Sequence, residues 1–240
     1  MKRGRKNRIQ RRLKWVFILI SVITAAYLSY LHFSDRNPSA ITLRELPEGF
    51  NSHGIDISHY QNEIDWEVLE ESLASTISFV YYKSTEGTRF VDPLAEEYSN
   101  NLSALNIEHG AYHFFTPSMS AEKQARHFLK NTSSSNTLPP VLDAETEGET
   151  DRKLIEGMQS WLRIVENQSG TKPIIYTSYN FYKTKFRGKF DGYEFWIASY
   201  SRKESRLKDD CIIHWQYSDK GAVPGIEGFV DLNFSKKIYN

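Results

Sequence analysis

Cysteine is almost absent from this 240-residue chain, which contains only Cys211. A single thiol cannot form an intramolecular disulfide, and a cysteine-based metal site needs several, so both features are excluded. The sequence also lacks an HExxH motif, internal repeats and any low-complexity tract beyond residues 131–137. These absences remove the commonest signature of zinc hydrolases and argue against a repeat architecture.

Acidic residues are missing from the first 14 positions, which hold eight of the 30 Lys and Arg residues. The net charge of zero therefore conceals a basic tail attached to an acidic body. Nucleic-acid binding depends on basic side chains that neutralise phosphates, so the acidic body argues against a nucleic-acid partner. Aromatic residues make up 14% of the chain, a composition that favours a packed core.

Charged side chains are also absent from residues 15–33. As a helix this run would span about 28 Å, close to the roughly 30 Å of a bilayer's hydrocarbon core. Basic residues before it predict a cytoplasmic N-terminal tail at residues 1–14 and a body outside the cytoplasm. We expect an uncleaved single-pass anchor, and the alternative is a cleaved signal peptide that would release the protein. Residues 34–52 are polar and predict a stalk.

From residue 53 to residue 240 the pattern predicts one domain in which strands and helices alternate. The predicted strands are 53–58, 77–85, 109–115, 139–145, 172–179, 193–200, 211–218 and 229–235. The predicted helices are 64–75, 92–106, 120–131 and 151–170. Alternation predicts a parallel α/β sheet, and eight strands predict a closed (β/α)8-like barrel. Because no long amphipathic helix follows residue 180, we expect an irregular barrel with helices missing in its C-terminal third.

Four acidic residues fall at or near predicted strand ends: Asp56, Asp143, Glu145 and Asp231. Active sites of parallel barrels lie at the C-terminal ends of the strands, so these carboxylates are expected to meet at one mouth. Residues two apart on a strand point the same way, which places Asp143 and Glu145 on one face and Ala144 on the other. Crowded acids raise at least one pKa toward the value that a general acid needs. A divalent metal site, or a set of helix caps, is the alternative.

The remaining charged residues near these strand ends are not expected to be catalytic. Glu147, Glu149 and Asp151 lead into a helix, where solvated acids favour the N-terminus. Lys83 and Glu86 are expected to pair or to hold the rim.

Aromatic side chains on the predicted strands are typical of packing. Tyr112 and His113 are adjacent and so face opposite sides, and the same holds for Trp215 and Gln216. Trp196 is predicted to belong to the core.

Eight blocks of sequence occur in the order seen in one known family. They are HGIDISHYQNEIDW, YYKSTEGTRFVDP, GAYHFF, PPVLDAE, IIYTSY, FWIASY, IIHWQYS and GIEGFVDLN. In this order they resemble the family 25 glycoside hydrolases, the Chalaropsis-type lysozymes, over residues 53–235. The resemblance implies a flattened β/α barrel that needs no cofactor and hydrolyses the β-1,4 bond between N-acetylmuramic acid and N-acetylglucosamine in peptidoglycan.

The resemblance also implies roles for individual residues. Glu145 matches the acid that protonates the leaving sugar oxygen. Asp143 matches the residue that orients the substrate's acetamido group, whose oxygen attacks the anomeric carbon. Asp56 and Asp231 match the other two acids of the family's site. The expected substrate-binding side chains are Tyr112, Tyr176, Tyr200 and Gln216.

Two other functions remain open at this stage. One is a glycan-binding module without activity on the same fold. The other is a chitinase-like or metal-assisted hydrolase. We expect a monomer whose partners are peptidoglycan and, through the anchor, a membrane.

Overall fold

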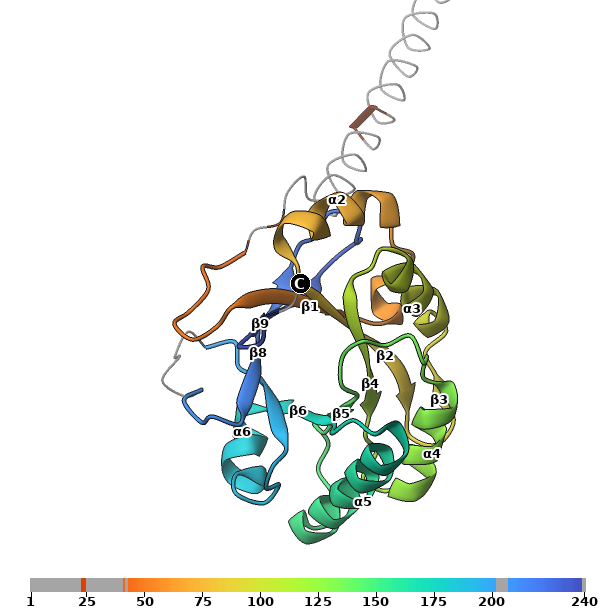
Figure 1. Ribbon diagram of the computed structural model, residues 1–240, viewed down its shortest axis with the longest axis vertical. Coiled ribbons are helices and arrows are strands. Elements are labelled where there is room, and N and C mark those ends of the chain that lie inside the picture. The colour runs from red at the N-terminus through yellow and green to blue at the C-terminus, as the bar shows by residue number, and fades with distance from the viewer. Residues whose placement is uncertain (1–22, 25–40, 42, 202–206, 239–240) are drawn as a thin grey trace, which may run out of the picture.

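The structure of the protein is a computed structural model that describes residues 23–24, 41, 43–201 and 207–238. Within these residues eight strands close into a barrel, because β1 pairs with β2 as well as with β9; Figure 1 shows the ring. The strands are β1 (Ser52–Ile57), β2 (Phe79–Glu86), β4 (Glu108–Phe114), β5 (Val141–Asp143), β6 (Ile174–Ser178), β7 (Glu194–Ala198), β8 (Ile212–Gly221) and β9 (Val230–Ser235). The predicted α/β barrel is confirmed.

Strand β9 departs from the predicted parallel order, since it runs antiparallel to both of its neighbours, β1 and β8. The connection between β8 and β9, residues 222–229, contains no helix. Antiparallel neighbours need only a short connection, whereas parallel strands need a long crossover. The prediction of a fully parallel barrel is therefore wrong at its last strand. A short further strand, β3 (Phe90–Val91), pairs with the end of β2 and was not predicted.

The barrel interior has an apolar floor beneath a polar mouth. The floor consists of Phe79, Tyr81, Leu138, Val141, Ile174, Tyr176, Trp196 and Ile213. Gly54 and Gly110 make room for its rings, because a Cβ at Gly54 would lie 2.3 Å from Phe79 and one at Gly110 2.5 Å from Tyr81. Two residues beyond Gly54, on the same face of β1, the side chain is Asp56. The same alternation on the other strands separates a packed lower layer from the polar upper one.

Four helices cover the outside of the barrel between the early strands (Figure 1). They are α2 (Trp66–Thr76), α3 (Ala95–Ala104), α4 (Ala121–Asn131) and α5 (Asp151–Ser169). Two of these helices have clear caps: at the start of α4 Ser120 Oγ accepts from the Lys123 amide, and Gly170 ends α5 with a left-handed φ of 71°.

After residue 180 the helices that the structure describes are short. They are the end of α6 (Tyr179–Phe181) and the π-helical turn η2 (Tyr182–Phe186). This confirms the prediction that helices are missing in the C-terminal third of the barrel.

The predicted tail at 1–14 and anchor at 15–33 lie outside the described residues, apart from residues 23–24. Among the helices that the structure does describe, none is long and apolar enough to cross a membrane. The end of the predicted stalk packs on the barrel: Phe50 is buried, and the Arg44 guanidinium lies 5.4 Å from the ring of Trp215. The packed body thus begins before residue 53.

Candidate active site

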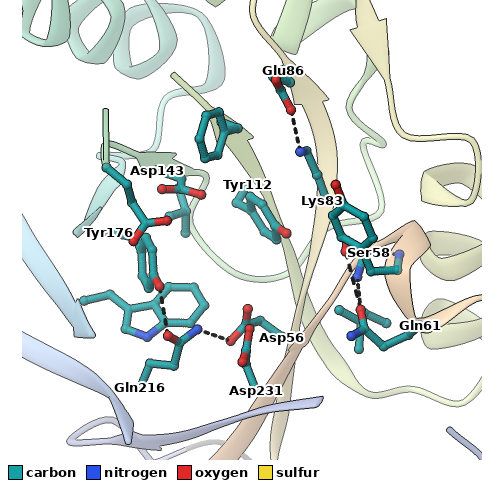
Figure 2. A pocket seen from close by; sticks show the side chains of 16 residues that line it. Asp56, Ser58, Gln61, Lys83, Glu86, Tyr112, Asp143, Tyr176, Gln216 and Asp231 are labelled. Atoms are coloured by element: carbon teal, nitrogen blue, oxygen red, sulfur yellow. Dashed lines mark hydrogen bonds and ion pairs between the residues drawn. The ribbon is translucent and has the colours of Figure 1, made fainter. Parts of the chain in front are cut away.

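A cavity of about 420 Å³ opens where the parallel strands end, and all four predicted acids line it. Asp56 comes from β1, Asp143 is the last residue of β5, Glu145 lies just beyond it, and Asp231 comes from β9. Figure 2 shows Asp143 on one side of the cavity and Asp56 beside Asp231 below it. Pockets that bind small molecules enclose roughly 300–1,000 Å³, so this one has the size of a ligand site.

Asp231 lies near the beginning of its strand, and not near the C-terminal end as predicted. Because β9 is antiparallel, its first residues lie at the end of the barrel where the other strands finish. Asp231 is the second residue of β9 and stands opposite Asp56 in the strand register. The two carboxyl groups therefore meet although one begins a strand and the other lies near the end of one.

Asp56 is the centre of a buried hydrogen-bond network. Its Oδ2 accepts from Gln216 Nε2 at 3.0 Å and from Asn233 Nδ2 at 2.7 Å, and it shares a further hydrogen bond with Asp231. Burial raises the pKa of Asp56, and these three bonds oppose the rise. Burial and the charge of Asp56 raise the pKa of Asp231 to about 9. Near neutral pH the pair therefore holds one proton, on Asp231, and one negative charge, on Asp56.

Gln216 links two tyrosines to this pair. Its Oε1 accepts from the hydroxyl groups of Tyr176, at 2.8 Å, and Tyr200, at 2.9 Å, while its amide nitrogen donates to Asp56. Trp215 faces the other way and donates to the Ser199 carbonyl oxygen, which confirms the predicted opposite parity. Tyr200 is 52% exposed and lies outside the set of residues that line the cavity, so it contacts the site from the rim.

Asp143 and Glu145 share a face, as predicted, although the strand is shorter than predicted. Strand β5 ends at Asp143. The extended path continues because the Ala144 amide donates to the Tyr176 carbonyl and Thr177 Oγ1 donates to the Ala144 carbonyl, at 2.9 and 2.7 Å. Ala144 is buried in the outer core, so the carboxyl groups on either side of it both turn into the cavity.

These two acids differ in their surroundings. Asp143 is buried, and its Oδ1 has no hydrogen-bond partner among the described residues. Burial and the nearby Glu145 carboxylate hold the pKa of Asp143 well above its usual range, and Lys83 opposes this rise. Glu145 is an exposed residue of the cavity wall, and partial burial and the charge of Asp56 raise the pKa of its carboxyl group. Glu145 therefore has the tuning of a general acid.

Tyr112 stands in the middle of the cavity (Figure 2). Burial, followed by the charges of Asp56 and Asp143, holds the pKa of its hydroxyl group well above the usual value, so this group stays protonated. His113 faces the outer core, where Thr85 and Gln124 bond its two ring nitrogens at 2.8 and 3.2 Å. Burial lowers the pKa of His113 to about 3, which makes it a neutral structural residue.

Some residues of the cavity wall were not predicted as site residues. They are Ser58, Tyr60, Gln61, Phe114 and Trp196, and Asn233 adds to the network beneath. Asn233 follows Asp231 by two residues, so the same-face rule could have found it. Tyr60 and Gln61 lie in the turn after β1, where no strand period applies. Trp196 is core, as predicted, and also forms part of the floor.

Lys83 and Glu86 form a pair at the cavity wall, and the three acids that lead into α5 are exposed, as predicted for both groups. Lys83 Nζ lies 2.6 Å from Glu86 Oε2, and both residues line the cavity. Glu147 and Asp151 form ion pairs with Lys185, and Glu149 forms one with Lys153. All three acids are exposed. In the part of the chain that the structure describes, no three His, Cys, Asp or Glu side chains are placed to hold a metal ion.

A closed α/β barrel with carboxyl groups gathered at its C-terminal mouth is typical of a glycoside hydrolase. Comparison with known families identifies which one. The sequence profile of the glycosyl hydrolases family 25 matches residues 55–226, and the chain belongs to that family. The resemblance found in the sequence is thereby confirmed.

Individual relatives agree with this assignment. The chain is 39% identical over 211 residues to "Uncharacterized protein YegX" of Escherichia coli (strain K12), covering 85% of this chain and 76% of that protein. It is 31% identical over 200 residues to Lysozyme M1 of Streptomyces globisporus, covering 75% of this chain and 66% of that protein. A family 25 glycosyl hydrolase structure from Bacillus anthracis matches with a TM-score of 0.72 and 26% identity, covering 84% of this chain and 96% of the other.

Proposed function

We propose that the protein is an N-acetylmuramidase, which hydrolyses the β-1,4 bond between N-acetylmuramic acid and N-acetylglucosamine in peptidoglycan. The observation that carries this proposal is the convergence of Asp56, Asp143, Glu145 and Asp231 on one cavity in a chain of family 25. The names of two relatives, Lysozyme M1 and the Autolytic lysozyme of Clostridium acetobutylicum, support the substrate class.

In the proposed reaction Glu145 transfers its proton to the glycosidic oxygen as the bond from that oxygen to the anomeric carbon breaks. The acetamido oxygen of the muramic acid attacks the same carbon, so a cyclic oxazolinium ion forms and no enzyme carboxylate is covalently attached. Water then adds to the anomeric carbon, and Glu145 recovers the proton from that water. The raised pKa of Glu145 supports its role as proton donor near neutral pH.

Asp143 is proposed to hold the acetamido group. Asp143 lines the cavity beside Glu145, which supports a role for its carboxylate as the acceptor of the acetamido N–H. A bond from that N–H favours the ionised carboxylate, and the positive charge of the oxazolinium ion favours it further. The Asp56–Asp231 pair keeps the wall beside it at a single negative charge, with Tyr176 and Gln216 held by the same network.

The test is mass analysis of the products from purified peptidoglycan, together with a Glu145→Gln variant. The parent chain should release muropeptides with a reducing N-acetylmuramic acid, and the variant should release none while its unfolding temperature is unchanged. Undiminished activity in the variant would rule out Glu145 as the acid. A parent chain that binds peptidoglycan without new reducing ends would favour a binding module instead.

We further propose that residues 15–33 anchor the enzyme in the cytoplasmic membrane with its body outside. The support is the uncharged run of 19 residues preceded by eight basic ones. Protease added to cells with a permeable outer layer should digest the body and spare a fragment that contains the N-terminus. Recovery of a shortened body from the medium would instead indicate cleavage.

A further inference from the structure

Tyr60 combines high exposure with a place in the cavity wall. Its side chain is 75% exposed, compared with 52% for Tyr200, and it lines the same cavity as Asp56 and Glu145. It lies in the turn η1 (His59–Gln61). In Figure 2 the neighbouring Ser58 and Gln61 stand across the cavity from Asp143. A ring this exposed contributes little to the stability of the fold. Its free face is therefore available to a ligand.

The turn that carries Tyr60 is firmly held. The Ser58 amide donates to Gln61 Oε1 at 2.8 Å, and Gln61 Nε2 donates to the Phe229 carbonyl at 2.9 Å. The Tyr98 hydroxyl bridges the carbonyl oxygens of Ser58 and Asn62, at 3.2 and 2.7 Å. The backbone on both sides of Tyr60 is thus tied to β1, α3 and the connection before β9. Fixing a binding group in advance reduces the entropy that a ligand must overcome.

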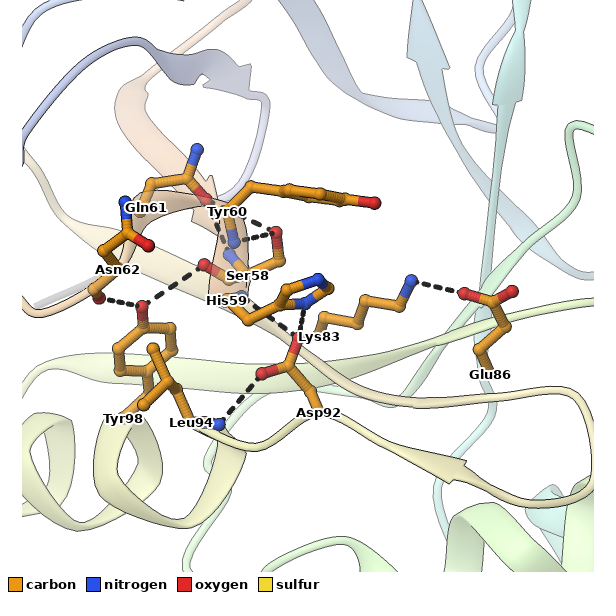
Figure 3. Close-up of polar contacts among 10 residues, drawn as sticks. All are labelled: Ser58, His59, Tyr60, Gln61, Asn62, Lys83, Glu86, Asp92, Leu94 and Tyr98. Carbon is orange, nitrogen blue, oxygen red and sulfur yellow. Dashed lines mark hydrogen bonds and ion pairs between the residues drawn. The ribbon is translucent and has the colours of Figure 1, made fainter.

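His59 supports the Tyr60 ring from below. Figure 3 shows His59 beneath Tyr60, and the two ring centroids are 4.2 Å apart at 34°. The centroid of the His59 ring also lies 5.7 Å from that of Phe90. Asp92, whose side chain is fully buried, fixes His59 through its Nδ1 at 2.7 Å and its backbone amide at 3.1 Å. Asp92 also accepts from the Leu94 amide at 3.0 Å. A buried carboxylate thus orients an imidazole that packs against the exposed ring.

We propose that the Tyr60 ring is a stacking platform for an N-acetylglucosamine ring that flanks the muramic acid in the bound glycan. This inference rests on the proposed muramidase function and extends it to the next sugar. Hexopyranose rings present a face of C–H groups, which packs on an aromatic ring, and a rigid tyrosine offers such an area at low entropic cost. N-acetylglucosamine fits better than muramic acid because it carries no lactyl-peptide on its ring. His59 and Asp92 act as positioning residues.

The test measures binding without turnover, in a Glu145→Gln background. The probe is the peptide-free tetrasaccharide of alternating N-acetylglucosamine and N-acetylmuramic acid, titrated by calorimetry. Adding Tyr60→Ala should weaken binding about tenfold, about 1.4 kcal/mol. Tyr60→Phe keeps the ring and should stay within about twofold of the parent. Ile238→Ala is the control, since Ile238 is 76% exposed, does not line the cavity and takes no part in the bonds described above for the turn that carries Tyr60.

A second measurement separates stacking from structure. In the active chain Tyr60→Ala should raise KM about tenfold and leave kcat within about twofold, because stacking contributes to substrate and transition state alike. Asp92→Asn should give a smaller rise in KM, which a positioning role predicts. Unchanged binding in Tyr60→Ala, or equal losses in the alanine and phenylalanine variants, would overturn the proposal. If the parent bound the glycan through Tyr60 but cleaved nothing, the platform would stand and the muramidase function would fail.

Discussion

Asp56 and Asp231 stand opposite each other on β1 and β9 and share a hydrogen bond. Burial and the neighbouring negative charge raise the pKa of Asp231 to about 9, so this residue holds the proton of the pair. Gln216 and Asn233 direct their amide groups at Asp56, which stabilises its charge. The wall of the cavity therefore contains one ionised and one neutral carboxyl group near neutral pH. Because Asp231 must take up a proton when the chain folds at this pH, the pair lowers the folding stability.

Asp231→Asn should stabilise the chain at alkaline pH. An unfolded Asp releases its proton near pH 4, whereas folded Asp231 keeps it to about pH 9, so folding stability falls as the pH rises between these values. Asparagine still donates to Asp56 and removes this dependence. At pH 8, about four units above the pKa of an unfolded Asp, this linkage amounts to on the order of 5 kcal/mol. At roughly 2–4 °C per kcal/mol, the unfolding temperature of the variant should exceed that of the parent by at least several degrees.

The stabilisation should be confined to high pH and to this site. At pH 4 the variant and the parent should unfold at the same temperature, because Asp231 is protonated there in the folded parent and half protonated in the unfolded one. Asp191→Asn, at an exposed site outside the cavity, should shift neither value. A variant no more stable than the parent at pH 8 would show that Asp231 does not hold the proton.

Lys83→Met should move the acidic limb of the activity profile to higher pH. Burial and Glu145 raise the pKa of Asp143, and Lys83 opposes them, so loss of the ammonium group raises this pKa further. The proposed mechanism needs Asp143 ionised, and activity then falls at a higher pH than in the parent. The measurement is kcat/KM from pH 4 to pH 9. Lys83→Arg keeps the charge and should keep the limb, whereas identical profiles for all three chains would contradict the electrostatic role.

The sequence predicted much of this site because strand periodicity determines which side chains share a face. Asp143 and Glu145 follow from that rule, as does the separation of Gln216 from Trp215. The orientation of β9 does not follow, because local patterning in a strand is the same in either direction. Tyr60 and Gln61 could not be predicted either, since a turn after a strand has no period. Their placement depends on contacts with Tyr98 and Phe229, which are distant in sequence.

Removing the acetamido group from the substrate should slow hydrolysis about as much as removing Asp143, the residue proposed to hold that group. Peptidoglycan de-N-acetylated at muramic acid should react on the order of 10² to 10³ times more slowly, because it lacks the internal nucleophile. Asp143→Ala should cause a loss of similar size with the acetylated glycan and little further loss with the de-acetylated one. Glycan de-acetylated only at N-acetylglucosamine is the control. Additive losses would mean that Asp143 acts on another group.

The first product should be the β-anomer of the new reducing sugar. Attack by the acetamido oxygen inverts the anomeric carbon once, and water inverts it again when it opens the oxazolinium ion, so the original configuration returns. Proton NMR of fresh digests, recorded before mutarotation, distinguishes the two anomers. If the α-anomer came first, water would attack directly, and the Asp143 carboxylate in the cavity wall would serve to activate that water. Glu145 would keep its role as acid in either case, so this measurement tests for direct attack by water and leaves the role of Glu145 untouched.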